Sequence, residues 1–389
     1  MVWGVGKSSS RVTPISVRKN TTSRGLLVRR WLAFILVLFP FVALAQANGK
    51  LQLHFIDVGQ GDAALLISPQ GETVFFDNGY YKACGKPVAY LDQLGVQDID
   101  YHIASHYHED HIGCSGDIFA AFPLQTAAYD RGGAYESSSY TKYVAAVTGK
   151  RQTAAKGTTI ILDRAATPVT IAILGLNGNG IDTDNENDRS VVAKVSMGSF
   201  DAVSGGDLSG VETDDYLDIE SGLAPDVGQI EVYKVHHHGS RYSSNATWLN
   251  TLRPRVGVIS AGSTNSYGHP TDACLQRLHD AGITTYWTST GNGADPVDGV
   301  DHVVGTVIVE YAIGANSFSV TGTRANSPLA TFSLWEPAAP RWVWSTASKS
   351  HVHHDPTCSW AAQISSKNRK EGSQPPAGWR LHTGCPTDE

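Results

Sequence analysis

The most informative stretch of this chain is His106-Tyr107-His108-Glu109-Asp110-His111, which has the pattern His-x-His-x-Asp-His. It directly follows residues 99–104, a run typical of a buried strand. On an extended backbone the first two histidines point to the same side and can reach one ion. If the chain then turns, the aspartate and the third histidine face a second ion. Imidazole and carboxylate bind zinc, manganese or iron, and a pair of such ions can activate water.

We therefore expect His106 and His108 to hold a first divalent ion, either zinc or manganese. Asp110 and His111 are expected to hold the second, which would generate the attacking hydroxide. A His-rich polar loop without a function is the competing interpretation. It fits poorly, because ionisable groups seldom cluster in this way without a role.

Later strand ends carry residue types that complete such a site. Asp207 follows a predicted hairpin and two glycines, and a carboxylate there can bridge two ions. His237 and His238 follow the strand predicted over residues 230–235. We expect His237, which lies nearer the strand end, to ligate the second ion, with His238 as the second choice. His269 follows the next strand and is a candidate general acid, although it could also ligate an ion or serve only in hydrogen bonding.

The ligand set of the first ion has a gap. No histidine occurs between residues 111 and 236. Either the first ion is weakly held, or Asp188 or Asn187 supplies an oxygen ligand. Asp62 and Asp77 lie at neighbouring strand ends, where they would orient ligand imidazoles or serve only their turns.

The fold class predicted from these patterns is a layered α/β protein with ligand residues at the carboxyl ends of strands. Residues 51–76 alternate and turn like a three-stranded meander. Residues 115–180 are rich in Gly, Ser and Tyr, and we expect them to form loops over the site. Gly239-Ser240 opens a helix-like segment whose amides could bind a phosphate. The hydrolase domain is predicted to cover residues 48–326.

Residues 1–47 are predicted to be a signal peptide. They contain seven basic residues, no acidic residue, an apolar run and an Ala-x-Ala ending. A retained anchor is the alternative, but the apolar run is short and contains a proline. We expect a secreted or periplasmic protein without stable membrane insertion after cleavage. The formal net charge of the whole chain is −7, and removal of residues 1–47 makes the mature chain still more acidic. This excludes a broad basic face for nucleic acid.

A linker is predicted at residues 327–341 and a small separate module at 342–389. His354-x-x-x-Cys358 and His382-x-x-Cys385 form two ligand pairs with spacings suited to a structural zinc. A disulfide between the two cysteines is the alternative. We favour zinc, because a disulfide leaves the histidines unexplained. The other three cysteines are expected to be core thiols: Cys84, Cys114 and Cys274.

The hexapeptide resembles the signature of the metallo-β-lactamase superfamily, whose fold is an αβ/βα sandwich. Seven short motifs between residues 50 and 315 occur in the order found in the hydrolase domain of ComEC-type competence DNA-uptake proteins. In that family the domain is thought to degrade one DNA strand. The sequence predicts a secretion signal in place of the membrane channel of that family, so the resemblance does not imply DNA import. Residues 378–380, just before His382, resemble the zinc-binding piece related to the Ada repair protein, in which cysteine is usual at that position.

The residues and the resemblance together predict a secreted metal-dependent hydrolase that acts on a phosphodiester or nucleic acid. Two alternatives remain open at this stage. One is a hydrolase of another ester or a lactone, and the other is a non-catalytic binding protein with the same fold.

Overall fold

The computed structural model describes residues 47–335, 342–347, 352–354, 358, 360–372 and 378–382. The predicted signal segment apart from residue 47, part of the predicted linker and Cys385 lie outside these residues. Within the described ranges, no helix has the length and apolarity needed to cross a bilayer.

The first sheet has nine strands in the order β17-β16-β15-β1-β2-β3-β4-β5-β6. The predicted meander is formed by β1 (Leu51–Phe55), β2 (Ala64–Ile67) and β3 (Thr73–Phe76). β4 (Ile99–Ile103) pairs parallel with β3, so the hexapeptide leaves the sheet at the carboxyl end of β4. The other strands are β5 (Leu124–Asp130), β6 (Arg151–Thr153), β15 (Val307–Tyr311), β16 (Ser317–Gly322) and β17 (Ala330–Ser333).

The second sheet has eight strands in the order β14-β13-β12-β11-β10-β9-β8-β7. Its centre is the hairpin of β9 (Val192–Met197) and β10 (Phe200–Ser204), followed by the parallel strands β11 (Val232–Lys234) and β12 (Val256–Ile259). The outer strands are β7 (Thr159–Leu162), β8 (Val169–Gly175), β13 (Thr284–Trp287) and β14 (Asp301–Val303).

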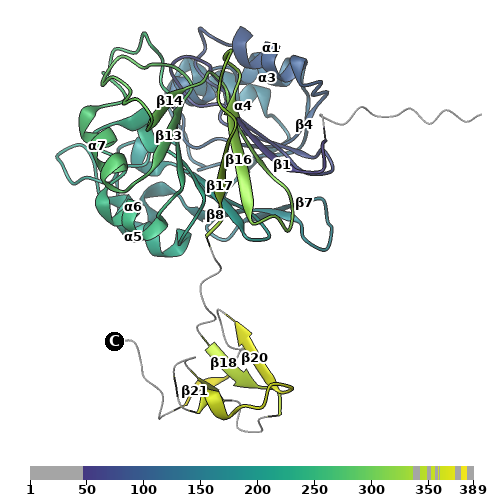
Figure 1. Cartoon of the computed structure of the whole chain (residues 1–389). Coiled ribbons are helices and arrows are strands. Elements are labelled where there is room, and N and C mark those ends of the chain that lie inside the picture. The colour runs from purple at the N-terminus through teal and green to yellow at the C-terminus, as the bar shows by residue number, and fades with distance from the viewer. Residues whose placement is uncertain are drawn as a thin grey trace, which may run out of the picture. The chain divides into compact units, whose positions relative to one another are not determined.

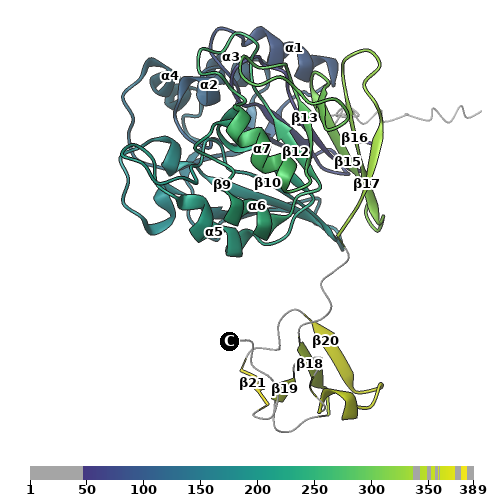
Figure 2. The same ribbon diagram turned by 60° about the vertical axis from the view of Figure 1, so that its left-hand side comes forward.

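The two sheets pack face to face, and helices cover the outer face of each (Figures 1 and 2). One apolar core lies between the sheets and includes Leu53 and Phe76 from the first and Ile171 and Val258 from the second. Two further cores lie under the helices. The first sheet is covered by α1 (Gly85–Gln93), α3 (Ser115–Ala121) and α4 (Ser138–Ala146), and the second by α5 (Ile219–Val227), α6 (Ala246–Leu252) and α7 (Asp272–Asp280). The αβ/βα sandwich expected from the sequence is therefore confirmed.

Residues 115–180 are more regular than predicted, because α3, α4 and β5 to β8 lie within them. Their Gly and Ser content suggested loops, but long-range contacts stabilise the elements. Tyr143 on α4, for example, is buried and donates a hydrogen bond from its hydroxyl to Asp130 at the end of β5 (2.8 Å).

The first sheet also continues into the predicted linker. β17 pairs antiparallel with β16, and the Phe332 ring stacks on Phe318. Trp335 packs under two guanidinium groups, those of Arg253 and Arg255. The first sheet therefore extends beyond residue 326, the predicted end of the domain, and the stacked rings hold its last strand against β16.

The cysteines differ from the expectation of scattered core thiols. Cys84 and Cys114 form a disulfide across 30 residues of sequence. This bond joins the N-terminus of α1 to the segment that follows the hexapeptide. Cys274 is a free buried thiol, as predicted.

The C-terminal module contains a four-stranded sheet in the order β20-β18-β19-β21. Its strands are β18 (Trp342–Ser345), β19 (Val352–His354), β20 (Arg369–Gly372) and β21 (Arg380–Leu381). The His354 and His382 rings lie near each other, with centroids 4.9 Å apart. Cys358, however, is disulfide-bonded, so it offers no thiolate to a zinc ion. This favours the disulfide alternative over the zinc site that we preferred.

Candidate metal centre

The hexapeptide turns sharply after β4. His108 is extended and immediately precedes the short helix α2 (Glu109–Ile112), which places Asp110 and His111 in its single turn. Backbone bonds hold this turn in place, since the Asp110 carbonyl accepts the Asp62 amide (3.1 Å) and the His111 carbonyl accepts the Asn78 amide (2.7 Å). The first two histidines thus project from extended chain and the last two ligand residues from a helical turn, as the sequence predicted.

Asp207 reaches the hexapeptide from the end of β10 in the opposite sheet. Two glycines precede it because the backbone passes very close to other side chains. A Cβ at Gly205 would collide with His236, and one at Gly206 would collide with Ser105. Gly206 also has a φ of 53°, which favours glycine.

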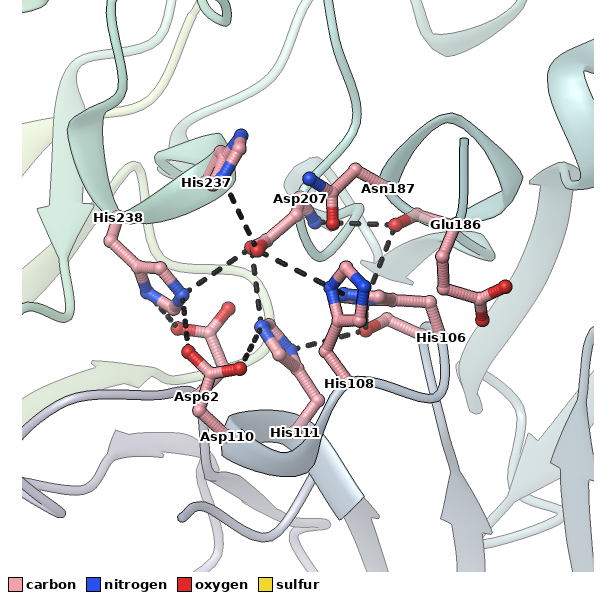
Figure 3. Close-up of polar contacts among 12 residues, drawn as sticks. Asp62, His106, His108, Asp110, His111, Glu186, Asn187, Asp207, His237 and His238 are labelled. Carbon is pink, nitrogen blue, oxygen red and sulfur yellow. Dashed lines mark hydrogen bonds and ion pairs between the residues drawn. The ribbon is translucent and has the colours of Figure 1, made fainter. Parts of the chain in front are cut away.

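Four side chains converge around the position predicted for the second ion (Figure 3). His238 Nε2 lies 3.2 Å from Asp110 Oδ2 and 3.5 Å from Asp207 Oδ1, and His111 Nε2 lies 3.3 Å from the same Asp207 oxygen. Ligand atoms about 2.0 Å from a tetrahedral zinc are themselves about 3.3 Å apart. Three of these buried atoms have no hydrogen-bond partner, namely His111 Nε2, His238 Nε2 and Asp207 Oδ1. This donor set therefore fits a divalent cation.

His238, the second choice from the sequence, occupies this position rather than His237. The strand does not run straight on, because β11 ends in a turn in which both His237 and His238 adopt left-handed conformations (φ 51° and 55°). The turn is fixed by the His237 amide, which donates to the Gly206 carbonyl (3.1 Å). His238 Nδ1–H donates to the Ser260 carbonyl (2.9 Å), which leaves Nε2 for an ion.

His237 lies on the other side of Asp207, where the first ion was predicted. Its Nε2 is 3.7 Å from Asp207 Oδ2, and His106 Nε2 is 3.8 Å from the same oxygen. His106 Nε2 and His108 Nδ1 are 3.0 Å apart, again the spacing of two ligands on one ion. His237 therefore faces the shared carboxylate on the side where the sequence showed a gap, but it does not belong to the groups of described residues whose ligand atoms lie within 4.8 Å of one another.

The two oxygen ligands suggested for that gap have different positions. The side-chain carbonyl of Asn187 is buried without a hydrogen-bond partner, and the residue lines the cleft beside the metal centre. Asp188 instead accepts hydrogen bonds from the Leu217 amide (3.1 Å) and the Thr183 hydroxyl (3.2 Å). Both bonds go to Asp188 Oδ2, and Oδ1 is buried without a partner. Of these two residues, only Asn187 lines the cleft beside the metal centre.

The comparison with known proteins agrees with this geometry. The model of the metallo-beta-lactamase superfamily matches residues 57–263. The chain belongs to the metallo-β-lactamase superfamily. It is 22% identical over 309 residues to ComE operon protein 3 of Bacillus subtilis, covering 74% of this chain and 36% of that protein. It is 26% identical over 284 residues to Recombination protein 2 of Haemophilus influenzae, covering 71% of this chain and 33% of that protein.

The chain thus spans about one third of the length of these curated relatives, which are of the ComEC type that the motif order suggested. A solved structure, the metallo-β-lactamase fold protein YhfI of Bacillus subtilis, is also similar. It is 13% identical with a TM-score of 0.40, and the match covers 62% of this chain and 98% of YhfI.

The charges at this metallo-β-lactamase centre are strongly coupled. Burial alone would raise the pKa values of Asp110 and Asp207, but the imidazoles of His111 and His238 hold both below their usual range. Burial would likewise lower the pKa of His238, but the facing carboxylates raise it to about 10. Positive charge on protonated imidazoles thus balances the negative charge of the buried carboxylates. A bound divalent cation would supply this positive charge instead.

Asp77 and Asp62 contact the Nδ1 atoms of His111 and His238, on the side of each ring away from the predicted ion. Asp77 Oδ2 accepts hydrogen bonds from His111 Nδ1 (2.9 Å) and from the Ser105 hydroxyl (2.8 Å). Asp62 lies 3.3 Å from His238 Nδ1 and forms a buried ion pair with Lys234 (2.8 Å). Lys234 was not predicted as a site residue. A lysine inside an apolar strand is the signal that would have found it, because buried lysines need an acidic partner.

A second buried ion pair ties the Asn187 loop to the hexapeptide. Glu186 accepts the backbone amide of Tyr107 (2.8 Å) and two hydrogen bonds from the Arg131 guanidinium (2.8 and 2.6 Å). Asn187 follows directly in the chain. The loop that carries the Asn187 side chain is thus fixed to the backbone of Tyr107, which lies between His106 and His108.

A cleft of about 590 Å³ opens over the centre, and His269 lines it. Burial lowers the pKa of His269 to about 3, so its imidazole is neutral at neutral pH. Its Nδ1 is buried without a hydrogen-bond partner. The suggested phosphate site at Gly239-Ser240 is not supported, because the Ser240 amide already donates to the His237 carbonyl (2.8 Å).

Proposed function

We propose that this chain is a secreted metal-dependent phosphodiesterase or nuclease. The observation that carries the proposal is the position of Asp207 between two groups of imidazoles. One carboxylate oxygen faces His111 and His238, and the other faces His106 and His237. Two divalent ions, zinc or manganese, held in this way would supply an activated water and a clamp for phosphoryl oxygens.

The chain's own residues have distinct tasks in this proposal. Asp110 and Asp207 remain ionised and would hold the metal ions. The positive charge of these ions would attract an anionic substrate. Asp77 keeps the proton of His111 on Nδ1, so that Nε2 faces the ion. His269, at the wall of the cleft, is placed to interact with the leaving group through its neutral imidazole.

Support for a phosphodiester comes from the relatives, which include proteins named Recombination protein 2 and Competence protein ComA. Both names refer to processes that involve nucleic acid. The acidic composition of the chain argues against tight binding of long duplex DNA, but it argues less against a single strand drawn to the ions themselves. A non-catalytic role is disfavoured, because Asp110, His111 and His238 are intact and close enough together to share one ion.

The decisive experiment is a substrate screen with purified mature protein loaded with zinc or manganese. We expect hydrolysis of bis-para-nitrophenyl phosphate and single-stranded DNA, loss of both with a chelator, and recovery when metal is returned. Asp110→Ala serves as the inactive control. Turnover of lactones but of neither phosphodiester would establish the ester-hydrolase alternative, and no turnover with bound metal would favour a binding protein.

Secretion is a separate part of the proposal. The Cys84–Cys114 disulfide supports it, because disulfides persist mainly in oxidising compartments. We expect the mature chain to start at Gln46 or Asn48, which N-terminal sequencing of secreted material would show. Recovery of the uncleaved chain only with membranes would contradict this part and leave the chemistry untouched.

A further inference from the structure

The cleft over the metal centre continues into a second cleft. A second cleft of about 490 Å³ adjoins the first, and both are lined by Gln60, Glu109, Asp110 and Tyr267. Asp110 would hold the second ion, and this residue lines both clefts where they meet. A bound chain could therefore extend from this junction in two directions.

Cations without a close carboxylate partner lie on the two sides of the junction. Lys82 and Lys86 line the second cleft, and Arg241 lines the first. Lys86 forms an ion pair with Asp57 (3.5 Å), which is weak because both side chains are open to solvent. Within the described residues, Lys82 and Arg241 have no ion pair and instead lie near tyrosine rings. In an acidic protein, this placement leaves positive charge available on either side of the reacting position.

The two lysines are held firmly relative to the metal ligands. They lie on either side of Cys84, whose disulfide partner Cys114 is three residues after His111. The distance from the lysine segment to the second ion is thus set by a covalent bond.

Tyr267 stands at the junction and is 69% exposed, unusually high for a large aromatic residue. Its ring is stacked on the imidazole of His269, with centroids 5.8 Å apart and an interplanar angle of 24°. The His269 ring in turn lies edge-on to His237 (5.4 Å). One face of the Tyr267 ring therefore packs against His269, while much of the side chain remains exposed to solvent. Exposed, supported aromatic rings of this kind stack with nucleic-acid bases.

We propose that the two clefts form one groove for a single nucleic-acid strand whose reacting phosphodiester lies at the junction. Lys82 and Lys86 bind backbone phosphates on one side, Arg241 binds a phosphate on the other, and Tyr267 stacks with a base next to the reacting bond. The enzyme thus recognises an internal phosphodiester within a strand. This inference rests on the proposed function, because it assigns the substrate of the same metal centre.

Charge removal tests the phosphate contacts. The variants are Lys82→Ala/Lys86→Ala and Arg241→Ala, and the control is Lys142→Ala, an exposed lysine on α4 outside both clefts. For each, kcat/KM is measured on a single-stranded DNA oligonucleotide and on bis-para-nitrophenyl phosphate. We expect the ratio of the two values to fall by about tenfold or more in the test variants and to stay constant in the control. An unchanged ratio in the test variants would overturn the groove.

Binding of a fluorescent oligonucleotide, followed by anisotropy, separates this inference from the proposed function. The slope of log Kd against log salt should become shallower by about 0.7 for each phosphate contact removed. The binding result decides the groove even if the parent protein has no turnover. Turnover in the parent together with unchanged slopes in the variants would refute the groove alone.

Tyr267→Ala and Tyr267→Phe test the stacking contact. We expect Tyr267→Ala to weaken oligonucleotide binding by about tenfold and Tyr267→Phe to bind like the parent, because phenylalanine keeps the aromatic face. The loss in Tyr267→Ala should disappear with an abasic deoxyribose-phosphate strand. Equal losses in both variants, or a loss that persists on the abasic strand, would show that the ring does not stack with a base.

Discussion

His111 donates a hydrogen bond from Nδ1 to Asp77 Oδ2 at 2.9 Å, and this bond determines which nitrogen of the imidazole faces the metal centre. Carboxylates in this position also raise the basicity of a ligand imidazole. We predict that Asp77→Asn lowers the affinity for the second ion by about 10- to 100-fold without unfolding the domain. Titration against a chelating dye would measure the affinity, with Asp92→Asn on the surface of α1 as the control. Equal affinities in the two variants would show that Asp77 serves only its turn.

Of the three consecutive histidines after β11, His237 and His238 should affect different ions. We predict that His238→Ala removes the ion held with Asp110 and His111, while His237→Ala weakens only the ion held with His106 and His108. Metal analysis after controlled dialysis, combined with the absorption spectrum of the cobalt-substituted protein, distinguishes the two positions. If the two variants lose the same ion, the assignment of His237 to the first ion is wrong.

Substitution of Asp207 and substitution of His269 should have different effects on metal content and turnover. We expect Asp207→Ala to abolish hydrolysis and to lower metal content, because both ions share this carboxylate. His269→Ala should keep its metal and slow turnover by about 10²- to 10⁴-fold, the usual contribution of a side chain that assists proton transfer. Parallel measurement of metal content and kcat decides between them. Metal loss in His269→Ala would instead make this residue a ligand.

Buried histidines away from the centre should make the fold sensitive to acid. Burial lowers the pKa values of His54 and His102 to about 4, against 6.5 for an exposed imidazole. Between these values the unfolded chain binds more protons, so the free energy of unfolding decreases as the pH falls from about 6.5 to about 4. Each histidine accounts for a decrease on the order of 3 kcal/mol.

Urea denaturation of the chelated protein at several pH values would measure this effect. His102→Gln should make the pH dependence less steep than that of the parent, because the substitution removes a titrating group whose pKa burial lowers. Identical pH dependence in His102→Gln and the parent would contradict the prediction.

Much of the centre could be predicted because the hexapeptide is local. Its strand, its turn and its ligand types are all encoded within about ten residues, so His106, His108, Asp110 and His111 followed directly. Asp207 was recognisable because two glycines and a hairpin precede it.

The choice between His237 and His238 could not be predicted in the same way. Two successive left-handed residues in a turn reverse the expected facing of the side chains, and single-residue preferences give no sign of such a pair. The Cys84–Cys114 bond joins residues far apart in the sequence, so spacing alone could not indicate it. The strands between residues 124 and 175 were missed because their Gly and Ser content suggested loops, although β7 and β8 pair as a local hairpin.

The centre takes its ligands from both sheets of the sandwich. Asp110 and His111 follow β4 of the first sheet, whereas Asp207 and His238 follow β10 and β11 of the second. An ion at this place bonds the two halves of the domain to each other, so it also acts as a cross-link that the unfolded chain lacks. At a free metal concentration 100 times Kd, one such ion adds about 2.7 kcal/mol to the free energy of unfolding. The melting temperature of this domain should therefore report ion occupancy directly, before any substrate is known.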